Sequence, residues 1–153
     1  MDKRELKIDY FTCQNSFPAG YEELCRKAVE VSTKAYCVYS EFAVGAAVLL
    51  ENGEVILGNN QENAAYPSGM CAERTALFYA GAVRPDIAVK ALAIAACYKG
   101  LPRVNIVPPC GACRQVMAEV IKRFGRDFDV IMIGEKECVV IKASGLLPFS
   151  FDF

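Results

Sequence analysis

The dipeptide Asn52-Gly53 lies between two apolar segments, residues 42–50 and 54–60, and it limits the possible folds more than any other local feature. Both residues of an Asn-Gly pair tolerate the positive φ angles that short hairpin turns require. Each flanking segment has the length and apolar character of a β-strand. We therefore expect an antiparallel hairpin at this place.

The rest of the chain alternates between helical and strand patterns. Apolar residues recur at helical spacing between Tyr21 and Ala35, after a turn at Pro18-Ala19-Gly20. The later segments predict two more helices and three more strands, at about 71–82 and 110–124 and at 89–97, 127–134 and 137–143. Strands that follow one another through helices pair in parallel with right-handed crossovers. We expect an α/β fold of three layers, in which helices cover both faces of a five-stranded mixed sheet.

Length and composition narrow the class of protein. A chain of 153 residues predicts a single domain over residues 1–153. Hydrophobic residues make up 54% of it, which fits either a large core or apolar surface between subunits. The net charge is -1 and the basic residues are scattered, so we expect no nucleic-acid partner. Because no apolar run has membrane-spanning length and residues 1–11 lack a signal-like apolar core, we expect a cytoplasmic protein without membrane contact.

Three of the eight cysteines lie at the starts of two predicted helices. The spacing of Cys110 and Cys113 places both sulfurs on one side of a helical turn, where they can share a tetrahedral ion. Cys71 starts the other helix, also after a Pro/Gly turn. Helices that follow parallel strands begin at one edge of the sheet, so the three thiols can meet there. Three ligands with an open fourth position predict a catalytic zinc site.

Other interpretations of these cysteines remain open from the residues alone. Cys110 and Cys113 also fit a buried thiol pair or a redox pair, although redox pairs usually follow a strand in a thioredoxin-like unit. A zinc ion that only stabilises the fold would need a fourth protein ligand, for which Cys97 is the candidate. Cysteines outside this group of three lie singly in apolar patterns and resemble small apolar side chains: Cys13, Cys25, Cys37, Cys97 and Cys138.

Charged residues accompany the predicted zinc site. Glu73 lies in the first turn of the helix that Cys71 starts, where the helix dipole alone favours a glutamate. Next to a catalytic zinc ion, however, a carboxylate that does not bind the metal can carry protons. Arg74 and Arg114 each follow a ligand segment, and either guanidinium could donate to a thiolate and compensate its charge. Surface arginines are the alternative.

The segments CAERTA (71–76) and PCGACRQV (109–116) resemble the small homotetrameric cytidine deaminases, and the similarity runs from about Tyr36 to Phe151. YSEFAVGAAV, NNQENAAYPSGMCAERTA and LLP fit the same pattern. Zinc deaminases with a histidine ligand do not fit, because the chain has no histidine. The resemblance implies a homotetramer with one Zn²⁺ per subunit. It also implies hydrolytic deamination of cytidine and 2′-deoxycytidine, as free nucleosides, to uridine and 2′-deoxyuridine with release of ammonia, in pyrimidine salvage.

The resemblance also implies a role for each matched residue of the zinc site. Cys71, Cys110 and Cys113 match the zinc ligands, and Glu73 matches the proton shuttle between water, ring atom N3 and the leaving ammonia. These four residues are therefore the candidate catalytic centre.

Further matched positions imply substrate contacts. Backbone groups of Ala72 and Pro109 match those that contact the pyrimidine. Asn60 and Glu62 match the residues that bind the ribose 3′-hydroxyl, and Phe42 matches the aromatic wall of the pocket. Without the resemblance, Asn60 and Glu62 also fit a turn after a strand and Phe42 fits a core position.

The C-terminal segment and two departures leave alternatives open. Phe151 resembles an aromatic residue that enters a neighbouring subunit's pocket, and Phe149 and Phe153 compete for this position. Val38 and Ala65 stand where many members have proline and cysteine. A related branch that deaminates blasticidin S shares the cysteine and glutamate pattern, but the pair of polar residues at 60 and 62 favours a nucleoside sugar. A polynucleotide editor is disfavoured by the charge.

Overall fold

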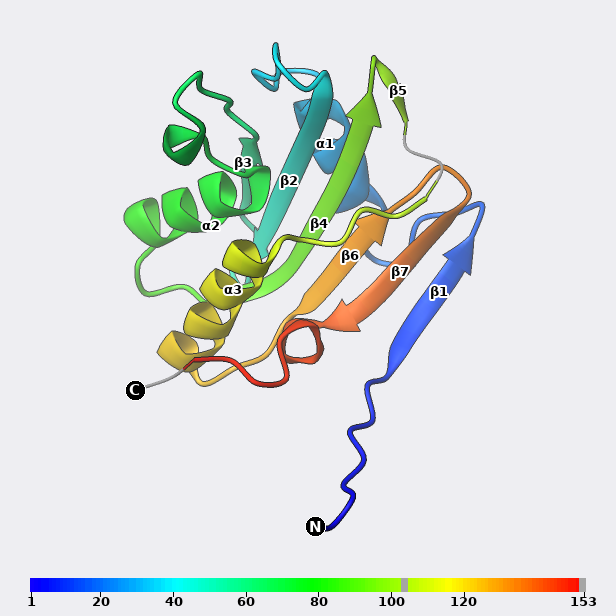
Figure 1. Cartoon of the computed structure of the whole chain (residues 1–153), viewed down its shortest axis with the longest axis vertical. Coiled ribbons are helices and arrows are strands. Elements are labelled where there is room, and N and C mark those ends of the chain that lie inside the picture. Colours follow the sequence, from blue (N-terminus) through cyan, green and yellow to red (C-terminus); the bar gives the residue numbers. More distant parts are fainter. Residues whose placement is uncertain (103–104, 152–153) are drawn as a thin grey trace.

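A computed structural model describes residues 1–102 and 105–151 as a mixed β-sheet with helices on both faces (Figure 1). The strands are β1 (Tyr10–Gln14), β2 (Phe42–Leu50), β3 (Val55–Asn59), β4 (Val89–Tyr98), β5 (Leu101–Pro102), β6 (Asp129–Ile133) and β7 (Glu137–Lys142). The helices are α1 (Glu22–Ser32), α2 (Ala72–Val83) and α3 (Gly111–Phe124), with short 3-10 turns η1 (Tyr66–Ser68) and η2 (Ala143–Leu146). The α/β class predicted from the sequence is confirmed.

The predicted hairpin is present, although its turn uses only one positive φ angle. Strands β2 and β3 pair antiparallel, with Ala47 opposite Leu57. The Gly53 amide donates to the Leu50 carbonyl at 2.9 Å, and Gly53 has φ 87°. Asn52 keeps a negative φ and its side chain accepts from the Glu54 amide at 3.0 Å. The glycine alone therefore provides the left-handed residue of the turn.

The strand order places the starts of α2 and α3 at the same edge of the sheet. The order is β1-β7-β6-β4-β2-β3, with β5 paired to β4. Strand β2 is antiparallel to both β3 and β4, so β3 and β4 both end next to the start of β2. Helix α2 connects β3 to β4 and crosses over β2, which lies between these two strands. Strands β4 and β6 are parallel neighbours joined through α3. The loops after β3 and β4 therefore meet at one edge, as expected from the sequence.

The sheet has seven strands rather than the predicted five. The first additional strand, β1, pairs antiparallel with β7, and four of its five residues are exposed. The second, β5, has two exposed residues that pair with the end of β4. Neither segment has the apolar pattern of a buried strand, so hydropathy could not reveal either of them.

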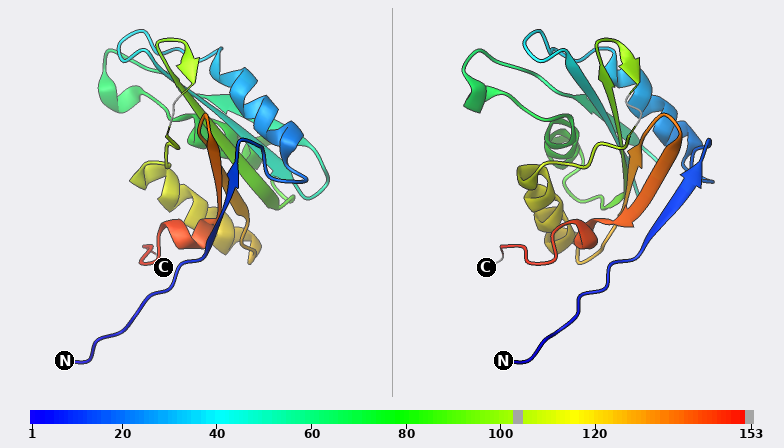
Figure 2. Two further views of the ribbon diagram at one scale, coloured as in Figure 1. Left: turned by 90° about the vertical axis from the view of Figure 1, so that its right-hand side faces the viewer. Right: turned by 45° about the vertical axis from the view of Figure 1, so that its right-hand side comes forward.

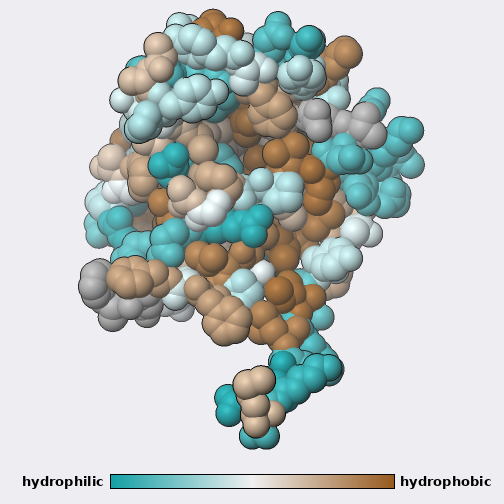
Figure 3. All heavy atoms as spheres, in the orientation of Figure 1, coloured by the Kyte–Doolittle hydropathy of each residue, from teal (hydrophilic) through white to brown (hydrophobic). Residues whose placement is uncertain are grey.

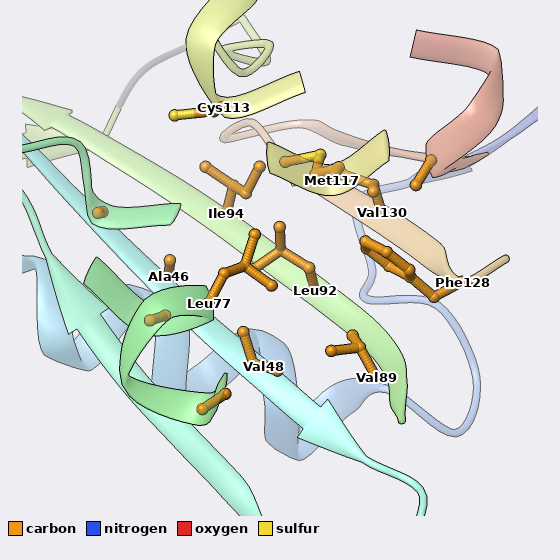
Figure 4. Packing of buried hydrophobic residues seen from close by; sticks show 14 of the residues in the cluster. Ala46, Val48, Leu77, Val89, Leu92, Ile94, Cys113, Met117, Phe128 and Val130 are labelled. Atoms are coloured by element: carbon orange, nitrogen blue, oxygen red, sulfur yellow. The ribbon is translucent and has the colours of Figure 1, made fainter. Parts of the chain in front are cut away.

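Helices cover both faces of the sheet, as the views in Figure 2 show, and a separate hydrophobic layer lies on each face. On one face, α1 packs Leu24 and Ala28 against Ala93 of β4. On the other face, α2 and α3 cover Leu92 and Ile94 of the same strand (Figure 4). Strand β4 is thus buried on both faces, as its continuous apolar sequence predicts.

Several aromatic side chains remain exposed on the protein surface. On α2 they are Phe78 and Tyr79, at 52% and 57% exposure, and in the C-terminal segment they are Phe149 and Phe151, at 91% and 67%. Figure 3 shows apolar atoms exposed on the face that carries α2 and α3. Within the described ranges, none of the helices combines the length and the apolar composition that crossing a membrane would require.

Candidate active site

The starts of α2 and α3 carry the three predicted zinc ligands. Cys71 directly precedes α2, Cys110 directly precedes α3, and Cys113 lies in the first turn of α3. Neither Cys71 nor Cys110 caps its own helix through its thiol. Close packing fixes the start of α2, because a Cβ atom at Gly58 of β3 would lie 2.7 Å from the Ala72 carbonyl oxygen.

The three thiols form a cluster of the size that a zinc ion needs. The sulfur of Cys110 lies 3.7 Å from that of Cys71 and 3.4 Å from that of Cys113. All three sulfurs lie within 4.8 Å of one another, and no second group of three potential ligands occurs in the described part of the chain. Zinc–sulfur bonds of about 2.3 Å in a tetrahedral site separate the sulfurs by about 3.8 Å. The donor set and its spacing therefore fit Zn²⁺.

Cys97 does not belong to this cluster. Its sulfur lies 3.7 Å from the hydroxyl of Ser32, at the end of α1, which covers the opposite face of the sheet. The described residues thus offer three thiols and no fourth cysteine to the ion. This arrangement disfavours a purely structural zinc site, which normally has four protein ligands.

Arg74 contacts the thiol cluster directly. Its Nη2 atom donates to the sulfur of Cys71 at 3.6 Å. A hydrogen bond from the Cys113 thiol, together with that from Arg74, lowers the pKa of Cys71 to about 5. The same sulfur contact and burial raise the pKa of Cys113. The guanidinium thus places a positive charge beside the Cys71 sulfur.

Arg114 contacts the backbone and not the sulfurs. Its Nε atom donates to the Pro109 carbonyl at 2.8 Å, and its Nη1 atom donates to the Leu146 carbonyl at 3.2 Å. Pro109 is fully buried. Arg114 therefore fixes the segment before Cys110 and connects it to η2, whereas the sequence left a thiolate contact and a surface position equally open.

Glu73 is one of two polar residues that the described chain buries in its interior, with 4% exposure. It lies in the first turn of α2 and lines the same pocket as Cys71 and Cys110. Burial raises the pKa of this carboxyl group, and the charge of Cys71 acts in the same direction. A carboxyl group in such an environment can both accept and return a proton, as a general acid–base catalyst does.

A pocket of about 520 Å³ joins the thiols to the predicted sugar-binding residues. Its lining includes the predicted residues Phe42, Asn60, Glu62, Ala72 and Glu73. Pro109 lies behind this surface, since the pocket is lined by its neighbours Pro108 and Cys110. The volume is in the usual range for sites that bind small molecules.

Asn60 has a structural role that its sequence position did not reveal. Its Oδ1 atom accepts from the Val44 amide at 2.7 Å, and its Nδ2 atom donates to the Phe42 carbonyl at 2.9 Å. The side chain thus continues the pairing of β3 with β2 beyond the last strand residue. Asn60 thereby fixes the backbone of Phe42, the predicted aromatic wall of the pocket.

Glu62 is held by the turn that precedes β2. Its carboxylate accepts hydrogen bonds from the Ser40 hydroxyl and from the amides of Tyr39 and Ser40. No motif or spacing in the sequence gives Ser40 or Tyr39 a role. The only signal was the position of both residues in a segment shared with the resembling family.

The C-terminal segment lies on α3, and Phe151 does not line the pocket of its own chain. The Gln115 side chain donates to the Phe151 carbonyl at 2.9 Å and accepts from the Phe151 amide at 3.3 Å. Phe149 and Phe151 are both exposed, and Phe153 lies outside the described residues. Gln115 was not predicted, and its clamp on the backbone has no local sequence signal.

Comparisons with known proteins show the family of this chain. A family model described as "Cytidine and deoxycytidylate deaminase zinc-binding region" matches residues 19–124. A cytidine deaminase of Halalkalibacterium halodurans is 50% identical over 129 residues, which cover 84% of this chain and 91% of that protein. A crystal structure of a cytidine deaminase from Burkholderia pseudomallei matches with TM-score 0.69 and 37% identity, and covers 84% of this chain and 97% of that one.

A second solved structure, of a cytidine deaminase from Mycobacterium tuberculosis, matches with TM-score 0.69 and 29% identity. It covers 89% of this chain and 100% of that chain. The family match includes Cys71, Glu73, Cys110 and Cys113. The three similar proteins named here are matched over nearly their whole length. The chain belongs to the cytidine and deoxycytidylate deaminase family, a family of hydrolytic deaminases.

Proposed function

We propose that the protein deaminates free cytidine and 2′-deoxycytidine to uridine and 2′-deoxyuridine and releases ammonia. The observation that carries this proposal is the buried Glu73 carboxyl group in one pocket with Cys71 and Cys110, whose sulfurs cluster with that of Cys113. Membership of a deaminase family and similarity to proteins named cytidine deaminase support it.

In this mechanism, Cys71, Cys110 and Cys113 hold one Zn²⁺. The bound ion supplies Lewis acidity, which makes water a nucleophile at neutral pH. Glu73 accepts a proton from the attacking water, whose oxygen forms a bond to C4 of the ring, and delivers a proton to N3. It then takes the second proton from the hydroxyl group now on C4 and delivers it to the amino group, so that the C4–N bond breaks as the C4 carbonyl forms, and ammonia leaves. Arg74 compensates part of the thiolate charge throughout.

The remaining pocket residues would bind and orient the nucleoside. Asn60 and Glu62 would hold the ribose 3′-hydroxyl, Phe42 would pack against the ring system, and backbone groups of Ala72 and Pro109 would contact the pyrimidine. A 3′-hydroxyl contact does not distinguish ribose from 2′-deoxyribose, so we expect both nucleosides to react. A carboxylate at the sugar disfavours phosphorylated substrates and polynucleotides through charge repulsion.

A homotetramer with a role in cytoplasmic pyrimidine salvage completes the proposal. The exposed aromatic residues on α2 and in the C-terminal segment support association between copies, since large apolar side chains on a surface often mark an interface. Phe151 would then enter the pocket of a neighbouring subunit. Static light scattering measures the mass in solution, and a monomer of 16.7 kDa would contradict this part.

The loss of ultraviolet absorbance on deamination tests the activity, with zinc quantified in the same sample. We expect turnover of cytidine and 2′-deoxycytidine but not of cytidine monophosphate. Glu73→Gln should reduce kcat by about 10²- to 10⁴-fold with zinc retained. The matched control is Glu30→Gln, which changes an exposed glutamate of α1 on the opposite face of the sheet. A zinc-loaded protein that leaves cytidine unchanged rejects the proposed function.

A further inference from the structure

The turn at residues 37–42 donates three hydrogen bonds to the Glu62 carboxylate. The Oε1 atom accepts from the Ser40 hydroxyl at 2.5 Å. The Oε2 atom accepts from the Tyr39 amide at 2.8 Å and from the Ser40 amide at 3.3 Å. Ser40 and Glu62 both line the pocket that contains the thiol cluster.

These bonds leave the carboxylate with one free acceptor direction. Each carboxylate oxygen has two lone-pair sites. Both sites of Oε2 and one site of Oε1 are used by the turn, and the described residues make no further hydrogen bond to Glu62. The hydrogen bond from Ser40, followed by that from Tyr39, lowers the pKa of Glu62. An ionised carboxylate in this state can accept one additional hydroxyl and cannot donate.

The Ser40 hydroxyl has a defined direction. It accepts from the Phe42 amide at 3.0 Å, so its own proton is directed to Glu62. The turn around it is also held, because the Glu41 amide donates to the Cys37 carbonyl at 2.9 Å and the Lys99 amide donates to the Glu41 carbonyl at 3.0 Å. Glu41 has φ 55°, a left-handed conformation that orients the adjacent Ser40.

We infer that Ser40 is a positioning residue that directs the last acceptor site of Glu62 toward one hydroxyl of the substrate sugar. This inference rests on the proposed function, which places a nucleoside in the pocket with its 3′-hydroxyl at Glu62. Ser40 acts on substrate binding through Glu62 and takes no part in the proton transfers at the ring. Its contribution therefore depends on the presence of the 3′-hydroxyl.

Kinetics with cytidine and 3′-deoxycytidine separate this role from a general structural one. We expect Ser40→Ala to raise KM for cytidine about tenfold, the usual order for a lost hydrogen bond to a charged group, with a smaller change in kcat. KM for 3′-deoxycytidine should stay as in the wild type. Ser40→Thr keeps the hydroxyl and should restore KM. The matched control is Ser68→Ala, an exposed serine of η1 outside the pocket lining.

A double-mutant cycle gives an independent measurement on cytidine alone. The double variant Glu62→Gln/Ser40→Ala should have the same KM for cytidine as Glu62→Gln alone, because the two residues act through one contact. Additive losses, or an equal loss for cytidine and 3′-deoxycytidine in Ser40→Ala, would overturn the role of Ser40 and leave the deaminase proposal intact. A wild-type protein that deaminates neither nucleoside would overturn the proposed function, and with it this inference.

Discussion

Among single residues, Arg74 is the cation that contacts the thiol cluster directly. Its Nη2 atom contacts the Cys71 sulfur at 3.6 Å, while its Nε atom is buried without a hydrogen-bond partner in the described residues. An unsatisfied buried donor destabilises the fold, so the contribution of this side chain lies in the contact of Nη2 with the Cys71 sulfur. Three thiolates around a Zn²⁺ ion would carry excess negative charge, which we expect this cation to offset.

We therefore expect Arg74→Gln to weaken zinc binding by about tenfold, the lower end of the effect of residues that support metal ligands. Competition with a zinc chelator measures this change without any activity assay. The control is Arg84→Gln, since Arg84 lies at the other end of α2 and pairs with Glu54 at 2.6 Å. An unchanged zinc affinity of Arg74→Gln would contradict the proposed charge compensation.

Tyr21 provides a pH-dependent contribution to stability away from the pocket. Its hydroxyl donates to the Asp129 carboxylate at 2.7 Å, and burial followed by this hydrogen bond raises the pKa of Tyr21 to about 12. The unfolded chain has the ordinary value of about 10. A raised pKa means that the stabilisation is complete below pH 10 and is lost as the pH rises toward 12.

Accordingly, Tyr21→Phe should lower the free energy of unfolding by about 1 kcal/mol at pH 8. The difference from the wild type should shrink between about pH 10 and pH 12. Urea unfolding at several pH values measures this difference. Burial also raises the pKa of Cys25, but both proteins keep that thiol, so its contribution to the pH dependence cancels in the difference. Tyr10→Phe, in an exposed tyrosine of β1, is the control. A difference that is constant with pH would contradict the role of the Tyr21 hydroxyl.

Single residues also show where sequence interpretation reaches its limit. The sequence could bring the three cysteines and Glu73 together as one candidate site, because their spacing at two helix starts carries chemical meaning. The bonds of Asn60 to the β2 backbone and of Arg114 to two carbonyls could not, because each joins residues that are distant in sequence. Nothing in the local pattern of an asparagine or an arginine specifies such partners.

At the scale of elements, the packing of α2 against β3 determines where Cys71 and Glu73 lie. A Cβ atom at Gly58 would meet Ala76 N at 2.6 Å and Ala72 O at 2.7 Å, and both are backbone atoms that cannot move without the helix. Gly58→Ala should therefore displace the first turn of α2, with loss of zinc and a fall in stability of about 1–3 kcal/mol. Zinc content and urea unfolding measure the two effects.

The control for Gly58→Ala lies in the same helix. At Gly81 a Cβ atom would meet only the flexible Arg123 side chain, at 3.4 Å. Gly81→Ala should keep zinc and raise stability by up to about 1 kcal/mol, since alanine favours a helix interior. If Gly58→Ala retained zinc as well as this control does, close packing would not be what positions Cys71.

Helices and long strands were predictable because each buries a regular apolar face. The hairpin around Asn52-Gly53 and the buried strand β4 are confirmed for this reason. Strands β1 and β5 were missed, because β1 buries little of its side-chain surface and β5 has two residues. Their pairing depends on the open edge of β7 and on the end of β4 that extends beyond β6, which a sequence pattern does not contain.

Over the whole molecule, the sheet order separates the pocket from the N-terminal strand. The pocket lies at the starts of α2 and α3, next to β2 and β3, whereas β1 forms the opposite edge beyond β7. Figure 1 shows the same separation, with β1 on the far side of the sheet from α2. Changes at the β1 edge should therefore affect the stability of the β7 edge but not the activity, and changes at the pocket should affect the activity but not the stability of the β7 edge.

Deletion of residues 1–14 tests this independence. Loss of β1 exposes the backbone donors and acceptors of β7, so we expect a lower Tm, by about 5 °C, and a greater tendency to aggregate. Zinc content and kcat for cytidine should stay as in the full chain. Deletion of residues 1–6, which precede β1 and are exposed, should change neither Tm nor aggregation. If removing β1 abolished zinc binding in protein that remains folded by circular dichroism, the two edges would be coupled through the sheet, and the location of the site could not be explained by the α2 and α3 crossovers alone.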